Sequence, residues 1–552
     1  MKKNILMAGL VILLSYFYQA ESYGCTNFLV TKGASVNGAT MISYAADSHV
    51  LYGELYYTPA QDHPAGSLLE VYEWDTGKFL GRIKQIPHTF SVVGNMNEHQ
   101  VAIGETTYGG RPGLVDTTGI IDYGSLMYIT LQRATSAKEA VQIMGDLVAE
   151  YGYCSSGESF SISDKNEVWI MEMIGKGPGN KGAVWVALKI PDGYVCAHAN
   201  QARITTFPLD DPGNCMYAGD VISFAREKGW FDGKDKDFSF SDTYAPVDFG
   251  GARFCEARVW AFFNHINGNM AEYLDYAMGK NLENRMPLWI KPDEKISVHD
   301  LMKYMRDHFE GTPMDMTADI GAGPYKLPYR WRPLTWEVNG EMYCNERATA
   351  TQQTGFSFIT ESRNWLPDWI GGILWFGVDD ASTTVYVPMY CGISEVPETF
   401  AEGNGDMITY SPTSAFWAFN FVANFSYLRY DTMIKDVRKV QSELESKFIQ
   451  NKPAVDKAAV ELYHSDPALA KDFITDYSVN MGNQTFRIWK ELGEFLLVKY
   501  IDGNIKKEKD GEFIYNEYGG MPVGPDQPGY PEWWYEKIGE STDHLKVIGE
   551  SH

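Results

Sequence analysis

Ser22-Tyr23-Gly24-Cys25-Thr26-Asn27-Phe28-Leu29-Val30 is the stretch around which the rest of this 552-residue chain is organised. Upstream of it, the chain starts with two lysines and an apolar run over residues 5–14, which is too short to cross a bilayer comfortably. Ser22 and Gly24 then place small residues at positions −3 and −1 of a cut before Cys25. This pattern is typical of a secretory signal peptide over residues 1–24, so we expect those residues to be removed and the protein to be exported, to the periplasm or the medium.

A cut at this position makes Cys25 the first residue of the mature chain. One residue then carries both a thiol and a free α-amine, which can serve as nucleophile and base. An α-amine with a pKa of about 7.7–8.0 is a well-matched base near neutral pH, and a thiol near 8.5 needs only modest help. The sequence therefore predicts that Cys25 is a catalytic nucleophile.

Two other interpretations of Cys25 stay open at this point. A cysteine after a signal peptide can accept a lipid anchor, which would make the protein a tethered binding protein. The usual anchor signal has Leu at −3 and Ala or Ser at −2, whereas this chain has Ser22 and Tyr23. Alternatively, the cut falls earlier, for instance after Ala20, and Cys25 is a buried structural residue, as free cysteines commonly are.

Composition limits the classes of protein to consider. With 44% hydrophobic and 14% aromatic residues, the chain can build a large core and more than one domain-sized unit. Beyond the first 24 residues no apolar run approaches the roughly 20 residues of a membrane span, so we expect no stable membrane association after their removal. The net charge of −25 makes nucleic acids and anionic membrane surfaces poor partners.

The cysteines argue against both a disulfide scaffold and a zinc site. There are seven of them, so at least one thiol is left unpaired within the chain even though export permits disulfides. Their spacings are wide and contain no C-x-x-C pair. We expect neither a metal nor a cofactor.

The pattern of elements indicates stacked sheets covered by helices rather than alternating βαβ units, because strand runs, helices and further strand runs follow one another. A capping box at Ser136 and Glu139 begins an amphipathic helix, and an Asn-Gly turn joins the first two strands. After about Tyr427 the pattern becomes helical, and the last fifty residues read as an aromatic, loop-like tail. The predicted strands are 28–30 with 39–43, 160–163 with 168–173 as one hairpin, 184–190 with 194–199 as another, and a later block over 355–388.

Several short motifs, taken in order, resemble one known family. They are Cys25-Thr26 followed by a hairpin and then Asp47, Asn97-Glu98, Gly104-Glu105-Thr106-Thr107, Glu167-Val168-Trp169, Ala199-Asn200-Gln201 with Arg203-Ile204, Arg258-Val259-Trp260, and Trp375-Phe376-Gly377-Val378-Asp379-Asp380. Together they resemble the dipeptidase A family of N-terminal-nucleophile (Ntn) cysteine peptidases. That family includes the secernins and is related to penicillin V acylases and bile salt hydrolases.

The resemblance implies a fold and a division of the chain. The expected fold is α+β, a four-layer αββα sandwich of two antiparallel sheets over residues 25–427. Residues 428–552 would add a helical region and a loop-rich tail packed on the catalytic domain. The implied activity is that of an exported cysteine dipeptidase, which cleaves dipeptides or similar small amides through an acyl-enzyme on Cys25. An amidase of the acylase or bile-salt type, sharing the chemistry, and the lipid-anchored binding protein remain the alternatives.

The resemblance also implies catalytic roles for four residues besides Cys25. Asp47 matches the acidic partner of the N-terminal amine, although it could be a turn-capping residue. Asn200 matches the side-chain donor of an oxyanion hole, where such a donor is worth about 3–4 kcal/mol, and its alternative is a buried Asn at a strand end. Arg253 and Arg258 flank the place of a catalytic-site arginine, and Ala252-Arg253-Phe254 makes Arg253 slightly preferred.

Two further residues are candidates for substrate binding, and one position departs from the relatives. Glu105, near where the acylases carry an Asn, and the adjacent Thr106 are expected to contact a small peptide substrate. Tyr44 stands where the acylases and some dipeptidases have an arginine, so the thiolate should be less stabilised here. No histidine belongs to a recognised nucleophile-pairing motif, and His198 is interpreted as a strand residue. Self-association into a homo-oligomer is compatible with the sequence.

Overall fold

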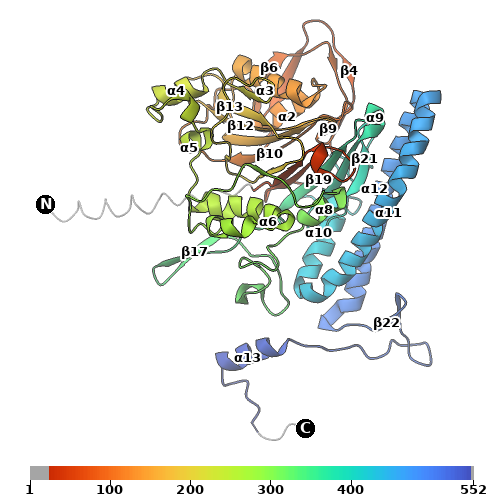
Figure 1. The fold of residues 1–552 in the computed structure, drawn as a ribbon. Helices are drawn as coiled ribbons and strands as arrows, with labels where there is room; N and C mark the ends of the chain where they lie inside the picture. Colours follow the sequence, from red (N-terminus) through yellow and green to blue (C-terminus); the bar gives the residue numbers. More distant parts are fainter. Residues whose placement is uncertain (1–23, 549–552) are drawn as a thin grey trace, which may run out of the picture.

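The computed structural model describes residues 24–548, so the predicted signal peptide up to residue 23 lies outside the described residues. Two large antiparallel sheets form the centre of the molecule (Figure 1). The seven-stranded sheet has the order β16 (Trp289–Ile290), β14 (Val195–His198), β1 (Asn27–Val30), β2 (Met41–Asp47), β19 (Thr354–Ser362), β20 (Gly372–Val378) and β21 (Val387–Tyr390). The eight-stranded sheet has the order β15 (Cys215–Tyr217), β13 (Ala183–Lys189), β12 (Val168–Gly175), β11 (Gly157–Ser163), β10 (Ala102–Tyr108), β9 (Met96–Asn97), β8 (Val92–Val93) and β3 (Tyr57–Thr58).

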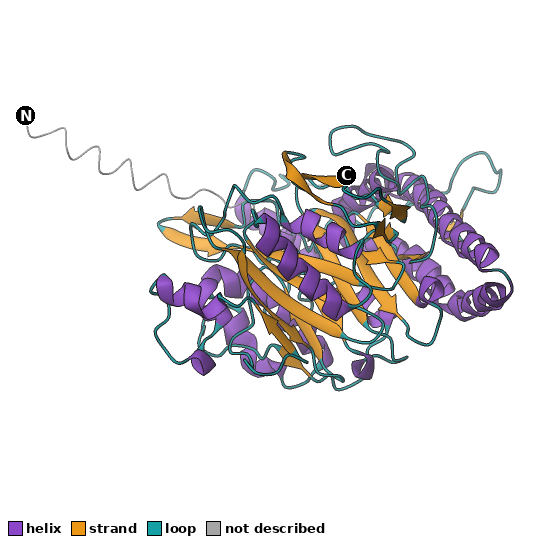
Figure 2. Cartoon of the chain, turned by 90° about the horizontal axis from the view of Figure 1, so that it is seen from above, coloured by secondary structure: helices purple, strands orange, loops and turns teal. Residues whose placement is uncertain are grey.

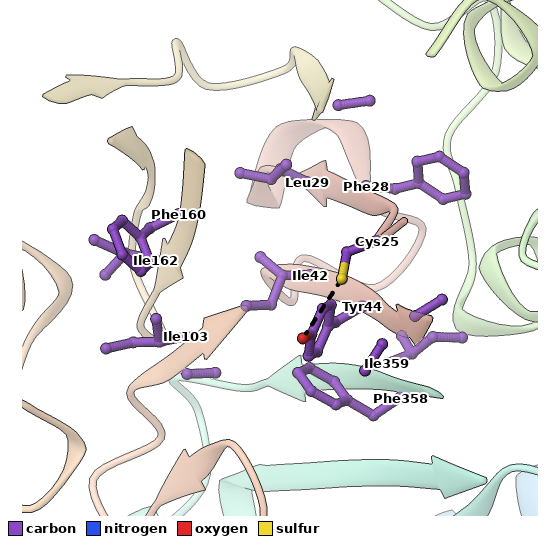
Figure 3. Packing of buried hydrophobic residues seen from close by; sticks show 14 of the residues in the cluster. Cys25, Phe28, Leu29, Ile42, Tyr44, Ile103, Phe160, Ile162, Phe358 and Ile359 are labelled. Carbon is purple, nitrogen blue, oxygen red and sulfur yellow. Dashed lines mark hydrogen bonds between the residues drawn. The ribbon is translucent and has the colours of Figure 1, made fainter. Parts of the chain in front are cut away.

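The two sheets contact each other through their central strands, since β1 and β2 lie against β10 and β11. Every residue of β1, β2 and β11 is buried, including the carboxyl groups of Asp47 on β2 and Glu158 on β11. Phe28, Ile42, Ile103 and Phe160 belong to the core between and around the sheets (Figure 3). The predicted first hairpin is confirmed, with Leu29 paired to Ile42.

Helices pack on both sheets, and Figure 2 shows strands in the middle of the molecule with helices around them. Three helices contact the eight-stranded sheet: α2 (Tyr123–Leu131), α3 (Ala137–Tyr151) and α4 (Val221–Glu227). The seven-stranded sheet is contacted by α6 (Ala257–Ile266), α8 (Val298–Tyr304) and α9 (Asp368–Gly371), and by the C-terminal helices described next. The predicted cap of α3 is half present, because Ser136 accepts from the Glu139 nitrogen while the Glu139 carboxylate bonds to Thr135 instead.

The C-terminal helical region begins close to the predicted position. The helices α10 (Ala415–Ser426), α11 (Tyr430–Ser465) and α12 (Pro467–Tyr500) pack against one another, and α12 lies along β21 at the edge of the seven-stranded sheet. Val437 and Phe448 of α11 and Trp489 of α12 are buried. Within residues 24–548, no helix combines the length and apolar character needed to cross a membrane.

The predicted hairpin over 184–199 is wrong, because its two strands belong to different sheets. β13 pairs with β12 and β15, whereas β14 pairs with β1 and β16. The turn at Pro191-Asp192-Gly193 carries the chain from one sheet to the other, and Thr31, just after β1, fixes it by bonding to the Gly193 nitrogen and the Tyr194 carbonyl. This crossing is what brings the end of β14 beside the start of β1. The predicted hairpin of β11 and β12 is confirmed, with Ser163 paired to Val168.

The tail differs from the prediction of a loop packed on the body. It contains a short hairpin of β22 (Glu508–Lys509) and β23 (Glu512–Phe513), and Trp533-Trp534-Tyr535 lies in the helix α13 (Glu532–Ser541), which buries none of its residues. In Figure 1, α13 lies apart from the sheets, and the Gly529 carbonyl before it accepts from Tyr325 and Arg429.

The remaining small elements are α5 (Phe240–Tyr244), α7 (Leu274–Ala277) and the hairpins β4 (Gln61–Asp62) with β7 (His88–Thr89), β5 (Leu68–Tyr72) with β6 (Phe79–Lys84), and β17 (Thr335–Val338) with β18 (Glu341–Cys344).

Candidate active site

Cys25 lies immediately before β1, at the place where the two sheets meet, and it is 6% exposed. Its Sγ is 3.8 Å from the hydroxyl of Tyr44 on β2, as drawn in Figure 3. The same sulfur is 3.5 Å from Oε1 of Glu105 on β10, and the Tyr44 hydroxyl donates to that oxygen at 2.5 Å. The sulfur is therefore held between a hydroxyl and a carboxyl group that come from different sheets.

The surroundings of the sulfur keep the thiol protonated. Burial raises the pKa of Cys25 well above its usual value, and the negative charges of Glu105 and Asp47 raise it further. The Asp47 backbone and the Tyr44 hydroxyl hold back only part of that rise. This agrees with the expectation from Tyr44, which brings no positive charge to the sulfur. A base must therefore remove the thiol proton as the sulfur attacks.

The nitrogen of Cys25 is held by Asn200, two residues beyond β14. It donates to Asn200 Oδ1 at 2.9 Å, while Asn200 Nδ2 donates to the Thr107 carbonyl at 2.6 Å. Asn200 has a φ of 62°, in the left-handed region that Asn tolerates better than most residues. This differs from the expected oxyanion-donor role, because the side-chain oxygen faces Cys25 and the amide nitrogen is already bonded to Thr107.

Arg258 on α6 fixes both Cys25 and Asn200. Its Nη1 donates to the Cys25 carbonyl at 2.5 Å and to Thr26 Oγ1 at 2.8 Å, and its Nη2 donates to Asn200 Oδ1 at 2.8 Å. Burial and the nearby charge of Arg347 lower the pKa of Arg258 to about 10. Because two donors meet at Asn200 Oδ1, the orientation of that amide is determined.

The preference for Arg253 over Arg258 is wrong. Arg253 forms an ion pair with Glu346 and donates to the Met278 carbonyl at 3.3 Å, and it makes no contact with Cys25. Arg253 lies in a π-helical turn over Gly251–Glu256, whereas Arg258 lies in the α-helix that follows it, and the two side chains bond to different parts of the chain.

Asp47 is buried beside Cys25, but its carboxylate bonds to other groups. Oδ2 accepts from Arg347 Nη2 at 2.5 Å, and Oδ1 accepts from Thr354 Oγ1 at 2.6 Å. Burial raises the pKa of Asp47, and Arg347 and Thr354 hold back that rise. Arg347 Nη2 also donates to the Gly24 carbonyl at 2.7 Å. The expected contact of this carboxylate with the Cys25 nitrogen is absent among the described residues, because Arg347 occupies it.

Arg347 was not predicted, and no local signal identifies it. It precedes β19 by several residues in a segment without an apolar period, and only the fold brings it to Gly24 and Asp47. Its ion pair with Asp47 is almost fully buried, with side-chain exposures of 4% and 0%.

Thr106 does not share the site, although Glu105 does. Successive residues of a strand point to opposite faces, so Thr106 faces away from Glu105. Its Oγ1 lies 2.7 Å from His198 Nδ1, and His198 Nε2 lies 2.7 Å from Ser161 Oγ. Burial lowers the pKa of His198 to about 3, so the imidazole is neutral. Thr106 and His198 therefore tie the two sheets together. The prediction that His198 is a strand residue is confirmed, whereas Thr106 lies away from the place expected for a substrate contact.

Glu105 has a second carboxyl group as its neighbour. Glu158 on β11 is fully buried, and burial and the adjacent Glu105 raise its pKa well above the usual value. Burial likewise raises the pKa of Glu105. Within residues 24–548, Oε2 of each residue lacks a hydrogen-bond partner, and no basic side chain pairs with either one. Two carboxyl groups placed together in this way share a proton or bind a cation.

A cavity of about 1270 Å³ opens beside these residues. Gly24, Asn200, Arg258 and Arg347 belong to its wall, so it reaches the main chain of the nucleophile. The arginines in the wall are Arg111, Arg258, Arg332 and Arg347, whereas its acidic residues are Asp248 and Glu337. Positive charge is thus concentrated here in a chain whose net charge is −25. Among the described residues, no group of three or more His, Cys, Asp or Glu side chains could hold a metal ion.

Comparison with known proteins agrees with this geometry. The sequence model of "Peptidase family C69" matches residues 55–443. The chain belongs to peptidase family C69. It is therefore a peptidase, and the resemblance to cysteine dipeptidases is confirmed at the level of the family. Cys25 and Asp47 precede the C69 match, so their roles depend on the structure alone.

Relatives of this C69 chain carry dipeptidase names. A "Probable dipeptidase" of Latilactobacillus sakei is 24% identical over 404 residues, which cover 69% of this chain and 77% of the relative. A "Probable dipeptidase" of Salmonella dublin is 24% identical over 391 residues, or 67% and 81% of the two chains. A "Probable dipeptidase B" of Streptococcus pyogenes serotype M1 is 23% identical over 517 residues, or 90% and 97%.

Proposed function

We propose that this peptidase is an exported cysteine dipeptidase that acts through Cys25. The observation that carries the proposal is the distribution of unpaired charge around the nucleophile. Glu105 contacts the sulfur and, like its neighbour Glu158, has no basic partner among the described residues, while the cavity that reaches the Cys25 main chain is rich in arginine. A free dipeptide is a zwitterion, with an ammonium and a carboxylate on either side of one peptide bond. The names of the relatives support the same substrate class.

Glu105 is within reach of the substrate ammonium. When the first residue of a dipeptide is attached to Sγ, its amine is three bonds of about 1.5 Å from the sulfur. Glu105 Oε1 lies 3.5 Å from Sγ, so the ammonium can contact this carboxyl group without moving the chain. An N-acylated substrate brings no cation to the buried acid pair, so it would be disfavoured.

The mechanism uses the α-amine of mature Cys25 as the base. Asn200 Oδ1, which accepts from the Cys25 nitrogen, would hold one amine hydrogen and leave the lone pair for the thiol. The sulfur attacks the carbonyl carbon as the amine takes the thiol proton, and the same proton passes to the leaving amine when the C–N bond breaks. Water then hydrolyses the thioester with the amine again acting as base. Arg258 positions Cys25 and Asn200, and Asp47 neutralises Arg347.

The finer features of the architecture belong to the same proposal. The two sheets with helices packed on each fit a four-layer αββα sandwich of the Ntn type, spanning residues 25–427, with residues 428–552 as a C-terminal addition. Export rests on the signal-peptide pattern of the first 24 residues. Small peptides are the expected partners, and self-association stays a prediction.

The proposal is tested with the mature protein, free dipeptides and the same dipeptides N-acetylated. We expect rapid hydrolysis of the free dipeptides, slow hydrolysis of the acetylated ones, a mass spectrum that begins at unmodified Cys25, and no activity in Cys25→Ala. Preferred hydrolysis of the N-acylated compounds would favour an acylase-type amidase, and a diacylglyceryl mass on Cys25 would favour the anchored binding protein.

The base is tested separately by leaving one uncleavable residue before Cys25. An amide nitrogen has no usable basicity, so the extended protein should keep a thiol that alkylates and a normal melting curve but should lose turnover. If it hydrolyses dipeptides at near the normal rate while keeping its extra residue, the N-terminal-nucleophile mechanism is wrong.

A further inference from the structure

Arg332 differs from the other arginines in the wall of the cavity. Arg347 is paired with Asp47, and Arg258 donates to the main chain at Cys25 and to Asn200. Arg111 lies over the ring of Trp230, 5.1 Å from its centroid, and its Nε donates to the Thr243 carbonyl.

Among the described residues, Arg332 donates to a single neutral acceptor, whereas Arg258 donates to five acceptors and Arg347 is paired with a carboxylate. Arg332 Nε and Nη2 donate to Gln353 Oε1 at 3.2 and 2.5 Å, and within residues 24–548 Arg332 forms no ion pair with a carboxylate. Burial and the charges of Arg347 and Arg258 lower the pKa of Arg332 to about 10, against the opposing charge of Asp47. Arg332 lines the same cavity as Gly24, Arg258 and Arg347. A half-buried cation among other cations is in an unfavourable potential, which a bound anion would compensate.

We propose that Arg332 binds the C-terminal carboxylate of the dipeptide substrate. This inference rests on the proposed function, since it assigns the second charge of the zwitterion to a residue. A guanidinium suits the task because its planar fork matches the two oxygens of a carboxylate. Gln353 accepts from Nε and Nη2 of Arg332, so Nη1 is left to donate to a ligand.

The same contact would limit the length of the substrate. In a dipeptide, the carboxylate carbon is three bonds from the carbonyl carbon that Cys25 attacks. Each additional residue moves the carboxylate by up to about 3.3–3.6 Å. A cation fixed in the cavity wall by Gln353 therefore favours one residue after the scissile bond and disfavours two.

The experiment compares a dipeptide with its C-terminal amide and with the tripeptide that carries one more residue. These substrates are measured on the unsubstituted protein, Arg332→Gln and Arg111→Gln. Arg111→Gln is the matched control, because it removes the same charge from the same wall but leaves Gln353 and Arg332 in place. Arg332→Lys tests rescue by a charge that lacks the planar fork, and melting curves confirm folding of each variant.

We expect the unsubstituted protein and Arg111→Gln to favour the acid over the amide. Arg332→Gln should lower kcat/KM for the acid about ten- to a hundredfold, mainly through KM, because a charged hydrogen bond is lost in ground state and transition state alike. The same variant should leave kcat/KM for the C-terminal amide almost unchanged, and it should reduce the preference for the dipeptide over the tripeptide. Arg332→Lys should recover part of the loss on the acid only.

Two results would overturn the assignment. If Arg332→Gln lowers the rates on acid and amide equally, Arg332 acts through Arg347 and the nucleophile and not on the carboxylate. If Arg111→Gln removes the preference for the acid and Arg332→Gln keeps it, the carboxylate binds at Arg111. Failure of the proposed function would be seen differently, because the unsubstituted protein would then hydrolyse none of the free dipeptides.

Discussion

The buried ion pair of Asp47 and Arg347 gives a prediction whose size follows from the structure. Both side chains are almost fully buried, and Thr354 is the other donor to the Asp47 carboxylate. Replacing Arg347 with Met keeps most of the volume and leaves a carboxylate in the interior without its counter-charge. Breaking a buried pair in this way costs about 3–5 kcal/mol, so Arg347→Met should lose that much stability at pH 8.

The loss should depend on pH in a defined direction. Arg347 lowers the pKa of Asp47 against the effect of burial, so its removal raises that pKa further. A carboxyl group whose pKa is raised in the folded state stabilises the fold below its unfolded pKa of about 3.9, and this contribution is lost as the pH rises through the folded pKa. Arg347→Met should therefore be closer to the unsubstituted protein at pH 5 than at pH 8. The double variant Arg347→Met, Asp47→Asn removes both charges and should recover about 2 kcal/mol at pH 8.

Urea unfolding followed by circular dichroism at the two pH values measures these differences. The reasoning is refuted if Arg347→Met loses less than about 1 kcal/mol, a value ordinary for an exposed pair. It is also refuted if the loss is equal at pH 5 and pH 8, or if the double variant is no more stable than the single one.

Three further predictions concern the site and its support. Glu105→Gln should lower kcat/KM on free dipeptides at least about tenfold more than on N-acetyl dipeptides, because a charged hydrogen bond to the ammonium is worth about 1.5–3 kcal/mol; initial rates on both substrates decide it. Arg258→Met should lower kcat about a hundredfold, because Asn200 loses the donor that holds its side chain in place. Arg253→Met should keep kcat near normal in the same assay. As the pH falls from 6.5 to 5, the free energy of unfolding of the unsubstituted protein should drop by about 2 kcal/mol more than that of His198→Gln. The reason is that the pKa of His198 is lowered in the folded state, so below the unfolded value of about 6.5 protonation favours the unfolded state. Urea unfolding at several pH values in this range measures the difference.

Local signals were sufficient for elements whose partners are near in sequence. The first hairpin is predictable from an Asn-Gly turn between apolar runs, and the strands that end at Ser163 and begin at Val168 are predictable in the same way. The segment over 184–199 carries an equally good hairpin signal at Pro191-Asp192-Gly193. Its strands nevertheless separate into two sheets, because β14 gains β1 as a neighbour, and that neighbour is more than 160 residues away.

The same limit explains what the sequence could and could not indicate about the site. Cys25, Asp47 and Asn200 stand in motifs that resemble a family, and the structure brings all three together. Thr106 was predicted to bind substrate because it follows Glu105 in the sequence. Successive residues of a strand face opposite sides, so its side chain points to His198 instead. Arg347 has no motif, because a counter-charge can come from any element that passes close enough, and its position in the sequence is free to vary. Glu158 has none either, since only the pairing of β10 with β11 brings it beside Glu105.

The roles of the charged residues follow from which of them the fold leaves without a partner. Buried charges cost free energy unless they are compensated, so the fold pairs Asp47 with Arg347 and surrounds Arg258 with carbonyl and amide oxygens. Among the described residues around Cys25, Glu105 and its neighbour Glu158 have no basic partner, and Arg332 has only the amide oxygen of Gln353. Their charges are opposite: Glu105 contacts the sulfur, and Arg332 lines the cavity beside Gly24 and Arg258. A single small zwitterion bound across Cys25 would satisfy both, and neither an N-acylated amide nor an uncharged substrate would.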